Sequence, residues 1–247
     1  MVQAQEAEDY KEARKFAQQT SKLTGNMIEE CKKLIEYMGI PVFQASSEGE
    51  AQSAYLVENR DAWACASQDY DTLLFGGERL VRNFAVSRSK KVKDTTVTLD
   101  IEYVSLQKLL EHLKITREQL VEMGILIGTD FFSGVPGIGQ HKALDLIKKY
   151  ESIENIRKEG VSIGKTLIDI DPEIVEQIKF IFLEPNIKRD YPKLKWEKID
   201  FEKIEDLLIE KHNFSKQRIV NALERLRKQD SSKTQVSLDN FLKKKDN

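Results

Sequence analysis

Five acidic side chains occupy three short stretches of the sequence, and their chemistry raises the question of a metal site. Glu48 and Glu50 lie in "QASSEGEAQSAYLV", Asp69 and Asp71 in "ACASQDYDTLLF", and Asp130 in "MGILIGTDFFSG". Within one partly desolvated cleft, these carboxylates would repel one another strongly. Such a cluster either takes up protons or is neutralised by divalent cations.

The ligand atoms of such a site determine which metal it suits. These residues offer oxygen alone, and oxygen ligands suit Mg²⁺ or Mn²⁺ better than zinc. Two such ions about 4 Å apart are the usual means of in-line phosphodiester cleavage, since one activates water and the other stabilises the leaving oxygen. The five acids are therefore candidates both for metal ligands and for catalytic residues.

Structural roles explain part of the same pattern. Ser47 to Glu50 fits a capping box at the start of a helix, where acids are also favoured by the helix dipole. Gly49 inside that first turn costs about 1 kcal/mol relative to alanine, which indicates that something approaches the backbone closely. Asp71 precedes the short helical "TLLF" and suits an N-cap, whereas Asp69 has no such role. Both interpretations stay open at this point.

Asp130 is predicted to end the apolar helix "MGILIG". A carboxylate there meets the unfavourable end of the helix dipole, at a cost of about 0.3–1 kcal/mol. A bound cation would reverse the sign of that interaction.

A glycine-rich turn follows directly, in "FFSGVPGIGQHKALDLIKKY". Gly137 and Gly139 allow backbone N–H groups to point outward at an anion, and the N-terminus of the following helix adds positive potential. Charge beside the turn comes from His141, Lys142, Lys148 and Lys149. An ordinary connection between two helices explains this stretch equally well. Beside an acidic cluster, the turn predicts a clamp on the phosphate backbone of duplex DNA that does not read sequence.

Helices and short strands alternate in the first half of the chain. A first helix is predicted to end at Gly39, a short strand to cover 40–45 and a helix to cover 48–59. "AWACAS" predicts a buried parallel strand, "RLVRNFAV" another strand, and "KVKDTTVTLDIEYVS" an antiparallel pair at the sheet edge. This order predicts an α/β domain with a partly parallel central sheet flanked by helices. The carboxyl ends of such strands face the ligand crevice.

The second half of the chain is predicted to be helical from Leu106 onward. Apolar periodicity ends near residue 228, and a flexible tail is predicted to follow. The expected divisions are 1–38, a core over 39–227, and the tail over 228–247.

Composition limits the class of protein. The 247 residues include 40% hydrophobic ones, enough for a sizeable core, but no run long enough to cross a membrane. The N-terminal residues are polar and do not resemble a signal peptide, and Cys31 and Cys65 are predicted to be buried reduced thiols. An intracellular protein, cytoplasmic and nucleoid-associated, is therefore expected. The net charge of −2 leaves nucleic-acid binding open, because local patches decide it.

Three motifs, in this order, resemble those of the archaeal flap structure-specific endonucleases of the XPG/Rad2 nuclease superfamily. They are "GIPVFQASSEGEAQSAYLV", "ASQDYDTLLFG" and "ILIGTDFFSGVPGIGQHKALDLI", and the likeness runs from about residue 13 to the C-terminus. The resemblance implies a PIN-like 5′-nuclease core with a helix–two-turn–helix element near 128–150. It also implies 5′ flap endonuclease and 5′–3′ exonuclease activity on branched DNA in replication and repair, with two Mg²⁺ ions.

The resemblance also assigns roles to individual positions. The family's pair of glutamates matches Glu48 and Glu50, its pair of aspartates matches Asp69 and Asp71, and its last aspartate matches Asp130. Gly137 and Gly139 match the helix–two-turn–helix element, which in the family grips downstream duplex with help from K⁺. His141 stands where the family usually has lysine, so one phosphate contact is expected to be weaker. Lys11, Arg14 and Lys15 match the returning leg of the helical arch that contacts DNA.

The tail contains a second, independent likeness. "QVSLDNFL" resembles the peptide that binds the sliding clamp (PCNA), with Gln235, Leu238, Phe241 and Leu242 at its anchor positions. Leu242 replaces the usual second aromatic, so the apolar anchor is smaller. A frayed terminus is the alternative.

The sequence departs from the family at its start. The family's first strands, two further aspartates of the metal site and the first arch helix have no counterpart from Met1 onward, so an incomplete metal site and impaired cleavage are expected. The alternative to a flap endonuclease is thus a non-catalytic or impaired fragment that binds DNA and the clamp. A gap-specific or excision-repair relative is a third candidate, against which the clamp-binding peptide argues.

Overall fold

The computed structural model describes residues 23–84, 89–92, 95–164 and 166–231. The chain divides into two compact units. One is continuous, Gln44–Pro192, and the other combines Met1–Phe43 with Lys193–Asn247. The three-part division expected from the sequence stays a prediction.

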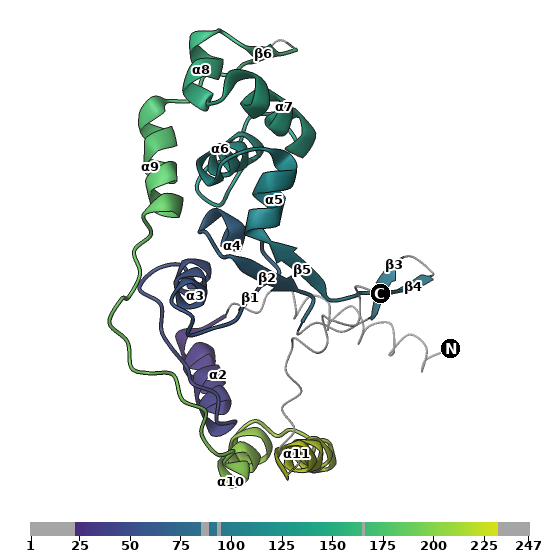
Figure 1. Cartoon of the computed structure of the whole chain (residues 1–247). Coiled ribbons are helices and arrows are strands. Elements are labelled where there is room, and N and C mark those ends of the chain that lie inside the picture. Colours follow the sequence, from purple (N-terminus) through teal and green to yellow (C-terminus); the bar gives the residue numbers. More distant parts are fainter. Residues whose placement is uncertain (1–22, 85–88, 93–94, 165, 232–247) are drawn as a thin grey trace. The chain divides into compact units, whose positions relative to one another are not determined.

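A small mixed sheet forms the centre of the continuous unit (Figure 1). Strand β2 (Arg79–Arg82) lies between β1 (Cys65–Ala66), to which it is parallel, and β5 (Glu102–Ser105), to which it is antiparallel. The partly parallel sheet is therefore as predicted. The expected antiparallel pair consists of β3 (Ser89–Val92) and β4 (Thr95–Thr98), but these strands form a separate two-stranded sheet, and β5 pairs with β2 instead.

Helices flank this sheet. α3 (Gly49–Glu58) contacts β1, and α4 (Asp71–Leu74) begins shortly after β1 ends. α5 (Leu106–Leu113) continues directly from β5 and is capped by the hydroxyl of Ser105. Leu73 of α4 and Leu106 of α5 pack with Leu80 of β2 in a buried cluster, on the side of the sheet where Figure 1 shows both helices.

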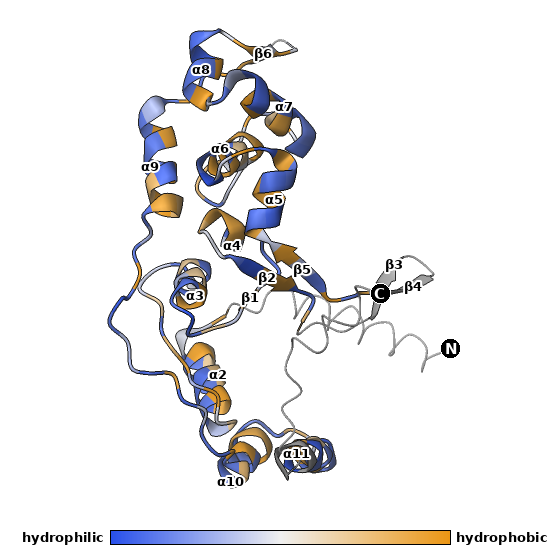
Figure 2. Ribbon diagram, viewed as in Figure 1, coloured by the Kyte–Doolittle hydropathy of each residue, from blue (hydrophilic) through white to orange (hydrophobic). Residues whose placement is uncertain are grey.

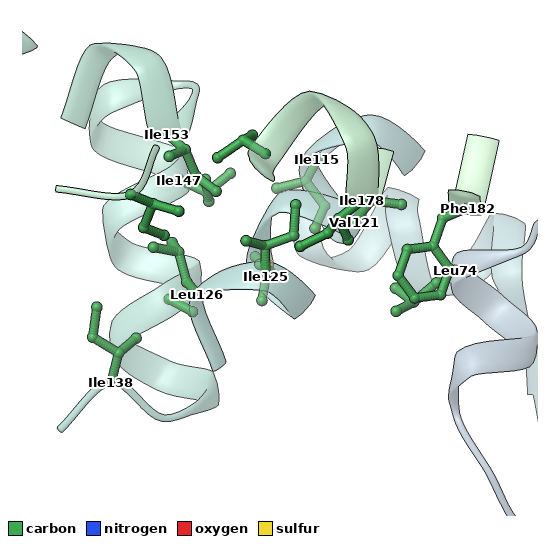
Figure 3. Close-up of a cluster of buried hydrophobic side chains, with 14 of the residues drawn as sticks. Leu74, Ile115, Val121, Ile125, Leu126, Ile138, Ile147, Ile153, Ile178 and Phe182 are labelled. Atoms are coloured by element: carbon green, nitrogen blue, oxygen red, sulfur yellow. The ribbon is translucent and has the colours of Figure 1, made fainter. Parts of the chain in front are cut away.

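The rest of the continuous unit is mainly helical, as predicted, but it also contains a short hairpin, and residues 184–192 are not helical. It comprises α6 (Arg117–Ile127), α7 (Gln140–Tyr150), α8 (Ile153–Lys158) and α9 (Pro172–Leu183), with a two-stranded hairpin of β6 (Ser162–Ile163) and β7 (Thr166–Leu167). Apolar residues alternate with hydrophilic ones along these helices (Figure 2). Their apolar side chains gather in the main core, in which Ile125, Ile147 and Phe182 are fully buried (Figure 3).

A buried polar network joins three of these helices. Glu122 of α6 is 4% exposed, and its Oε2 accepts a hydrogen bond of 2.7 Å from the backbone N–H of Ile153 at the start of α8. Lys179 of α9 lies 3.3 Å from the other oxygen, Oε1, and 2.6 Å from Glu118 Oε1. Burial raises the pKa of Glu122, while the bond from Ile153 and the charge of Lys179 oppose that rise. The network fixes the corner between α7 and α8 to α6.

The second unit contains α2 (Gly25–Tyr37), α10 (Phe201–Glu205), a π-helical turn η1 (Asp206–Lys211) and α11 (Lys216–Ser231). Its two chain segments are joined by backbone hydrogen bonds of 2.8 Å, from Glu197 N–H to Gly39 O and from Asp200 N–H to Tyr37 O. Thr24 caps α2 through its hydroxyl.

Two local expectations are wrong. Residues 40–45 are not a strand in the structure. Cys31 is exposed on α2, whereas Cys65 is buried as predicted. In the described part of the chain, no helix is both long and apolar enough to cross a bilayer.

Candidate metal centre and nucleic-acid interface

The loop that continues β1 carries two of the candidate ligands. The Ser67 hydroxyl donates to Glu50 Oε1 at 3.2 Å and accepts from the Asp69 N–H at 3.1 Å. The Asp71 N–H in turn donates to Asp69 Oδ1 at 3.1 Å. A continuous series of hydrogen bonds therefore links α3 to both aspartates. Ser67 was not identified from the sequence, because only its position between β1 and α3 reveals the role.

The predicted capping box at the start of α3 does not form. The N-cap is Glu48, in extended geometry and without a side-chain capping bond, while Glu50 lies in the first helical turn. A Cβ on Gly49 would meet nothing within 4 Å, so the protein itself does not require glycine there. The capping box is therefore wrong, whereas the expected placement of an acid in the first turn is confirmed for Glu50, and the backbone of this turn is open to close approach.

The predicted N-cap role of Asp71 is also wrong. Tyr70 takes that position, and Asp71 is the first residue of α4. The carboxylate is left for other interactions.

Asp130 lies beyond α6 and not in its last turn. The helix ends at Ile127, and Thr129 and Phe132 exchange backbone hydrogen bonds of 2.8 and 3.2 Å around a tight turn. Asp130 is exposed in this turn, outside the helix, so the unfavourable interaction with the helix dipole that was expected for a last-turn carboxylate does not apply. Gly128, with φ of 122°, ends the helix early.

Electrostatics connects the five acids. Burial raises the pKa of Asp71 from 3.8 to about 6, and the charges of four further carboxylates add to the rise. In decreasing order these are Asp69, Asp130, Glu50 and Glu48. The structure thus brings all five predicted acids into one electrostatic neighbourhood. Their role as metal ligands stays a prediction.

The carboxylates fit a hard divalent cation in donor type and in charge. Within the described residues, no three His, Cys, Asp or Glu side chains stand close enough to hold one ion. Mg²⁺, however, usually keeps several waters and is held by only one or two carboxylates. A hydrated ion of this kind suits acids that repel one another but do not converge on a point.

The connection between α6 and α7 is a glycine-dependent turn. A Cβ on Gly134, whose φ is 76°, would lie 2.3 Å from the carbonyl oxygen of Ile127, so a side chain has no room there. Gly137 also has a positive φ, 84°. The side chains of Val135 and Ile138 are buried, which anchors the turn in the main core.

The helix α7 carries the residues that are predicted to contact phosphate, and each is exposed. Gly139 is the N-cap and supplies no side-chain acceptor, so the first-turn N–H groups are not capped from that position. Lys142 is exposed and its Nζ donates to Gly137 O at 2.8 Å, which places an ammonium beside the turn. His141 is exposed near the same end, and Lys148 and Lys149 are exposed at the other end of the helix.

Other predicted residues cannot be placed against this site. Lys11, Arg14 and Lys15 lie outside the described residues, as do Gln235, Leu238, Phe241 and Leu242. Their roles stay predictions.

The raised pKa of Asp71 leads to a prediction about stability in the metal-free protein. A carboxyl group whose pKa is higher in the folded than in the unfolded state favours folding below pH 3.8 and loses that contribution as pH rises through about 6. Asp71→Asn, which cannot ionise, is therefore expected to raise Tm in EDTA at pH 8, with a gain that shrinks towards pH 4. Differential scanning calorimetry across this range checks it. Asp145→Asn, at an exposed position on α7, is the control, and a Tm gain at pH 8 no larger than the control's would contradict the prediction.

Comparison with known proteins supports the resemblance to the flap endonucleases that the sequence motifs indicated. Residues 39–130 match the model of the XPG I-region. The chain is 48% identical over 221 residues to a flap endonuclease 1 of Staphylothermus marinus, covering 88% of this chain and 61% of that protein. It is 45% identical over 242 residues to a flap endonuclease 1 of Ignicoccus hospitalis, covering 96% and 67%.

A solved structure agrees with the fold. Flap endonuclease-1 from Methanococcus jannaschii superposes with a TM-score of 0.69 and 34% sequence identity, covering 92% of this chain and 65% of that one. The predicted nuclease-core α/β fold is confirmed. The chain spans about two thirds or slightly less of the length of these three proteins. By its sequence and by its fold, this chain belongs to the flap endonuclease family.

Proposed function

We propose that this chain acts as a structure-specific 5′ flap endonuclease with 5′–3′ exonuclease activity, which cleaves phosphodiester bonds in branched DNA during replication and repair. The main observation is the series of hydrogen bonds that links Glu50 of α3 through Ser67 to Asp69 and Asp71. The charges of Glu48 and Asp130 add to this site, since they help to raise the pKa of Asp71. Family membership supports the substrate, since the relatives are flap endonucleases.

Two divalent ions complete the proposed site. Mg²⁺, or Mn²⁺ in its place, would supply an activated water and stabilise the leaving oxygen when bound. Glu48, Glu50, Asp69, Asp71 and Asp130 are the proposed ligands. Ser67 orients Glu50 and the 67–71 loop through its two hydrogen bonds. The carboxylates must be ionised to bind a cation, so the raised pKa of Asp71 implies weaker metal binding below about pH 6.

The glycine turn and α7 are the proposed duplex clamp. Gly137 and Gly139 allow the backbone to approach phosphates, and a K⁺ ion at the turn is part of this proposal. The cationic contacts would be His141, Lys142, Lys148 and Lys149, with Lys11, Arg14 and Lys15 on the arch. The clamp and the acids are directly connected, since Asp130 and Gly134 stand in the same link between α6 and α7.

The tail is proposed to bind the sliding clamp (PCNA). Only the sequence supports this, through Gln235, Leu238, Phe241 and Leu242. A short apolar segment that orders on a partner's groove is a known mode of recognition.

The second candidate is the one expected from the sequence, a module that binds DNA without cleaving it. The two candidates differ in metal-dependent cleavage, not in DNA affinity.

Cleavage of a 5′-flap duplex with Mg²⁺ decides between them. Asp69→Ala and Asp130→Ala are expected to reduce the single-turnover rate by more than the roughly 100-fold that loss of an outer-shell partner can cost, while the Kd for the flap duplex stays close to that of the wild type. Asp145→Ala, on the exposed side of α7, is the control. Wild-type protein that binds the duplex but does not cleave it would establish the binding module. Equal loss of cleavage and binding in both variants would mean that the two aspartates support the fold and not the chemistry.

A second prediction concerns the duplex clamp. Lys148→Ala and Lys149→Ala each remove one exposed charge, so each is expected to lower the slope of log Kd against log salt concentration by about one. Fluorescence anisotropy with two duplexes of unrelated sequence measures both the slope and the lack of sequence preference. Lys158→Ala is the matched control on α8, where the lysine pairs with Glu154 at 2.6 Å. An unchanged slope in the α7 variants would place the duplex elsewhere.

A further inference from the structure

Arg82 contacts the loop that carries two of the proposed ligands. It is the last residue of β2, and β2 runs parallel to β1, so Arg82 stands beside the loop where the chain leaves β1. Its Nε donates to Gln68 O at 3.2 Å, and its Nη1 donates to the Tyr70 hydroxyl. Nη1 also donates to Glu102 Oε2 of β5 at 2.6 Å. The arginine is thereby held from the sheet and bonded to the loop.

A second contact binds the same tyrosine. Arg82 Cζ lies 4.0 Å from the centroid of the Tyr70 ring, a cation–π geometry. The Arg82 side chain is 19% exposed, so much of this interaction is screened from water, although Tyr70 itself is 51% exposed. The two contacts with Arg82 therefore hold the exposed Tyr70 side chain, which lies between two aspartates in the sequence, in one position.

The contacts alternate along the loop. Ser67 bonds to Glu50 and to Asp69, and Asp69 bonds to Asp71. The two intervening residues, Gln68 and Tyr70, bond to Arg82. The loop is therefore held on two sides, by α3 through the odd-numbered residues and by β2 through the even-numbered ones.

We propose that Arg82 and Tyr70 are positioning residues, which fix the 67–71 loop so that the carboxylates of Asp69 and Asp71 keep a set orientation before a cation binds. Neither side chain is a proposed metal ligand. The role of this orientation in metal binding rests on the proposed function, whereas the ordering of the loop by Arg82 does not. The guanidinium suits the task because its rigid fork serves acceptors on the loop and on β5 while its Cζ lies over the Tyr70 ring, which an ammonium does not reproduce.

Hydrogen–deuterium exchange of the whole chain in EDTA tests the ordering directly, without metal or substrate. In Arg82→Met, the amides of Asp69 and Asp71 are expected to exchange about 10-fold faster or more, because their acceptors are no longer held in place. Arg82→Lys is expected to give an intermediate rate. Arg60→Met is the matched control, since Arg60 forms an exposed ion pair with Glu78 at 2.8 Å in the same unit.

Tyr70 variants separate the hydroxyl contact with Arg82 from the ring contact. They also test the proposal if the Arg82 variant does not fold. Tyr70→Phe keeps the ring and loses the hydroxyl, so a small increase in exchange is expected. Tyr70→Leu loses both contacts but leaves the Arg82–Glu102 pair, and a larger increase is expected. Exchange at wild-type rates in Tyr70→Leu and Arg82→Met would overturn the proposal.

Mn²⁺ binding measured by calorimetry supplies the functional readout. Loss of an outer-shell contact typically weakens metal binding by about 10- to 100-fold, and this is the loss expected for Arg82→Met with no change for Arg60→Met. Faster loop exchange with unchanged Mn²⁺ affinity would overturn the positioning role. A wild-type chain that binds no Mn²⁺ would count against the proposed function, while the exchange rates in EDTA would still decide whether the loop is ordered by Arg82.

Discussion

Mutual repulsion among carboxylates is the constraint on which this site depends. Asp71 is partly buried, and four other acids surround it closely enough to raise its pKa. A protein without a cation gains nothing from this arrangement, because each added negative charge makes ionisation of the others less favourable. A divalent ion would supply the missing positive charge, and the repulsion among the carboxylates would then become attraction to the ion.

The fold holds the repelling groups together by covalent and apolar means. α3 contacts β1, so Glu50 and the loop after β1 share one region, and the α6–α7 link adds Asp130. The apolar core of α6 to α9 fixes that link, since Val135 and Ile138 of the turn are both buried, and Figure 3 shows Ile138 among the core side chains. The proposed duplex clamp and Asp130 of the proposed metal site are thereby attached to the same pair of helices, α6 and α7.

Sequence patterns predicted the elements better than their contacts. The helices after residue 106 followed from periodicity, while the five acids were selected by residue type and by the family resemblance, and their role as ligands stays a prediction. The capping box at Ser47 was wrong because a matching pattern does not fix which residue becomes the N-cap. Ser67 and Arg82 were not identified from the sequence because their partners, Glu50 on α3 and Gln68 in the loop after β1, come close only in the folded chain. The predicted strand over 40–45 was wrong because a short apolar segment needs a paired neighbour to become a strand.

The most direct test of the shared acidic site is crystallography with Mn²⁺, located by its anomalous scattering. The account predicts a metal peak bounded by carboxylates of the 67–71 loop, by Glu50 at the start of α3, and by Asp130 in the turn after α6. Metal found only elsewhere on the molecule, with these acids left free in saturating Mn²⁺, would contradict it.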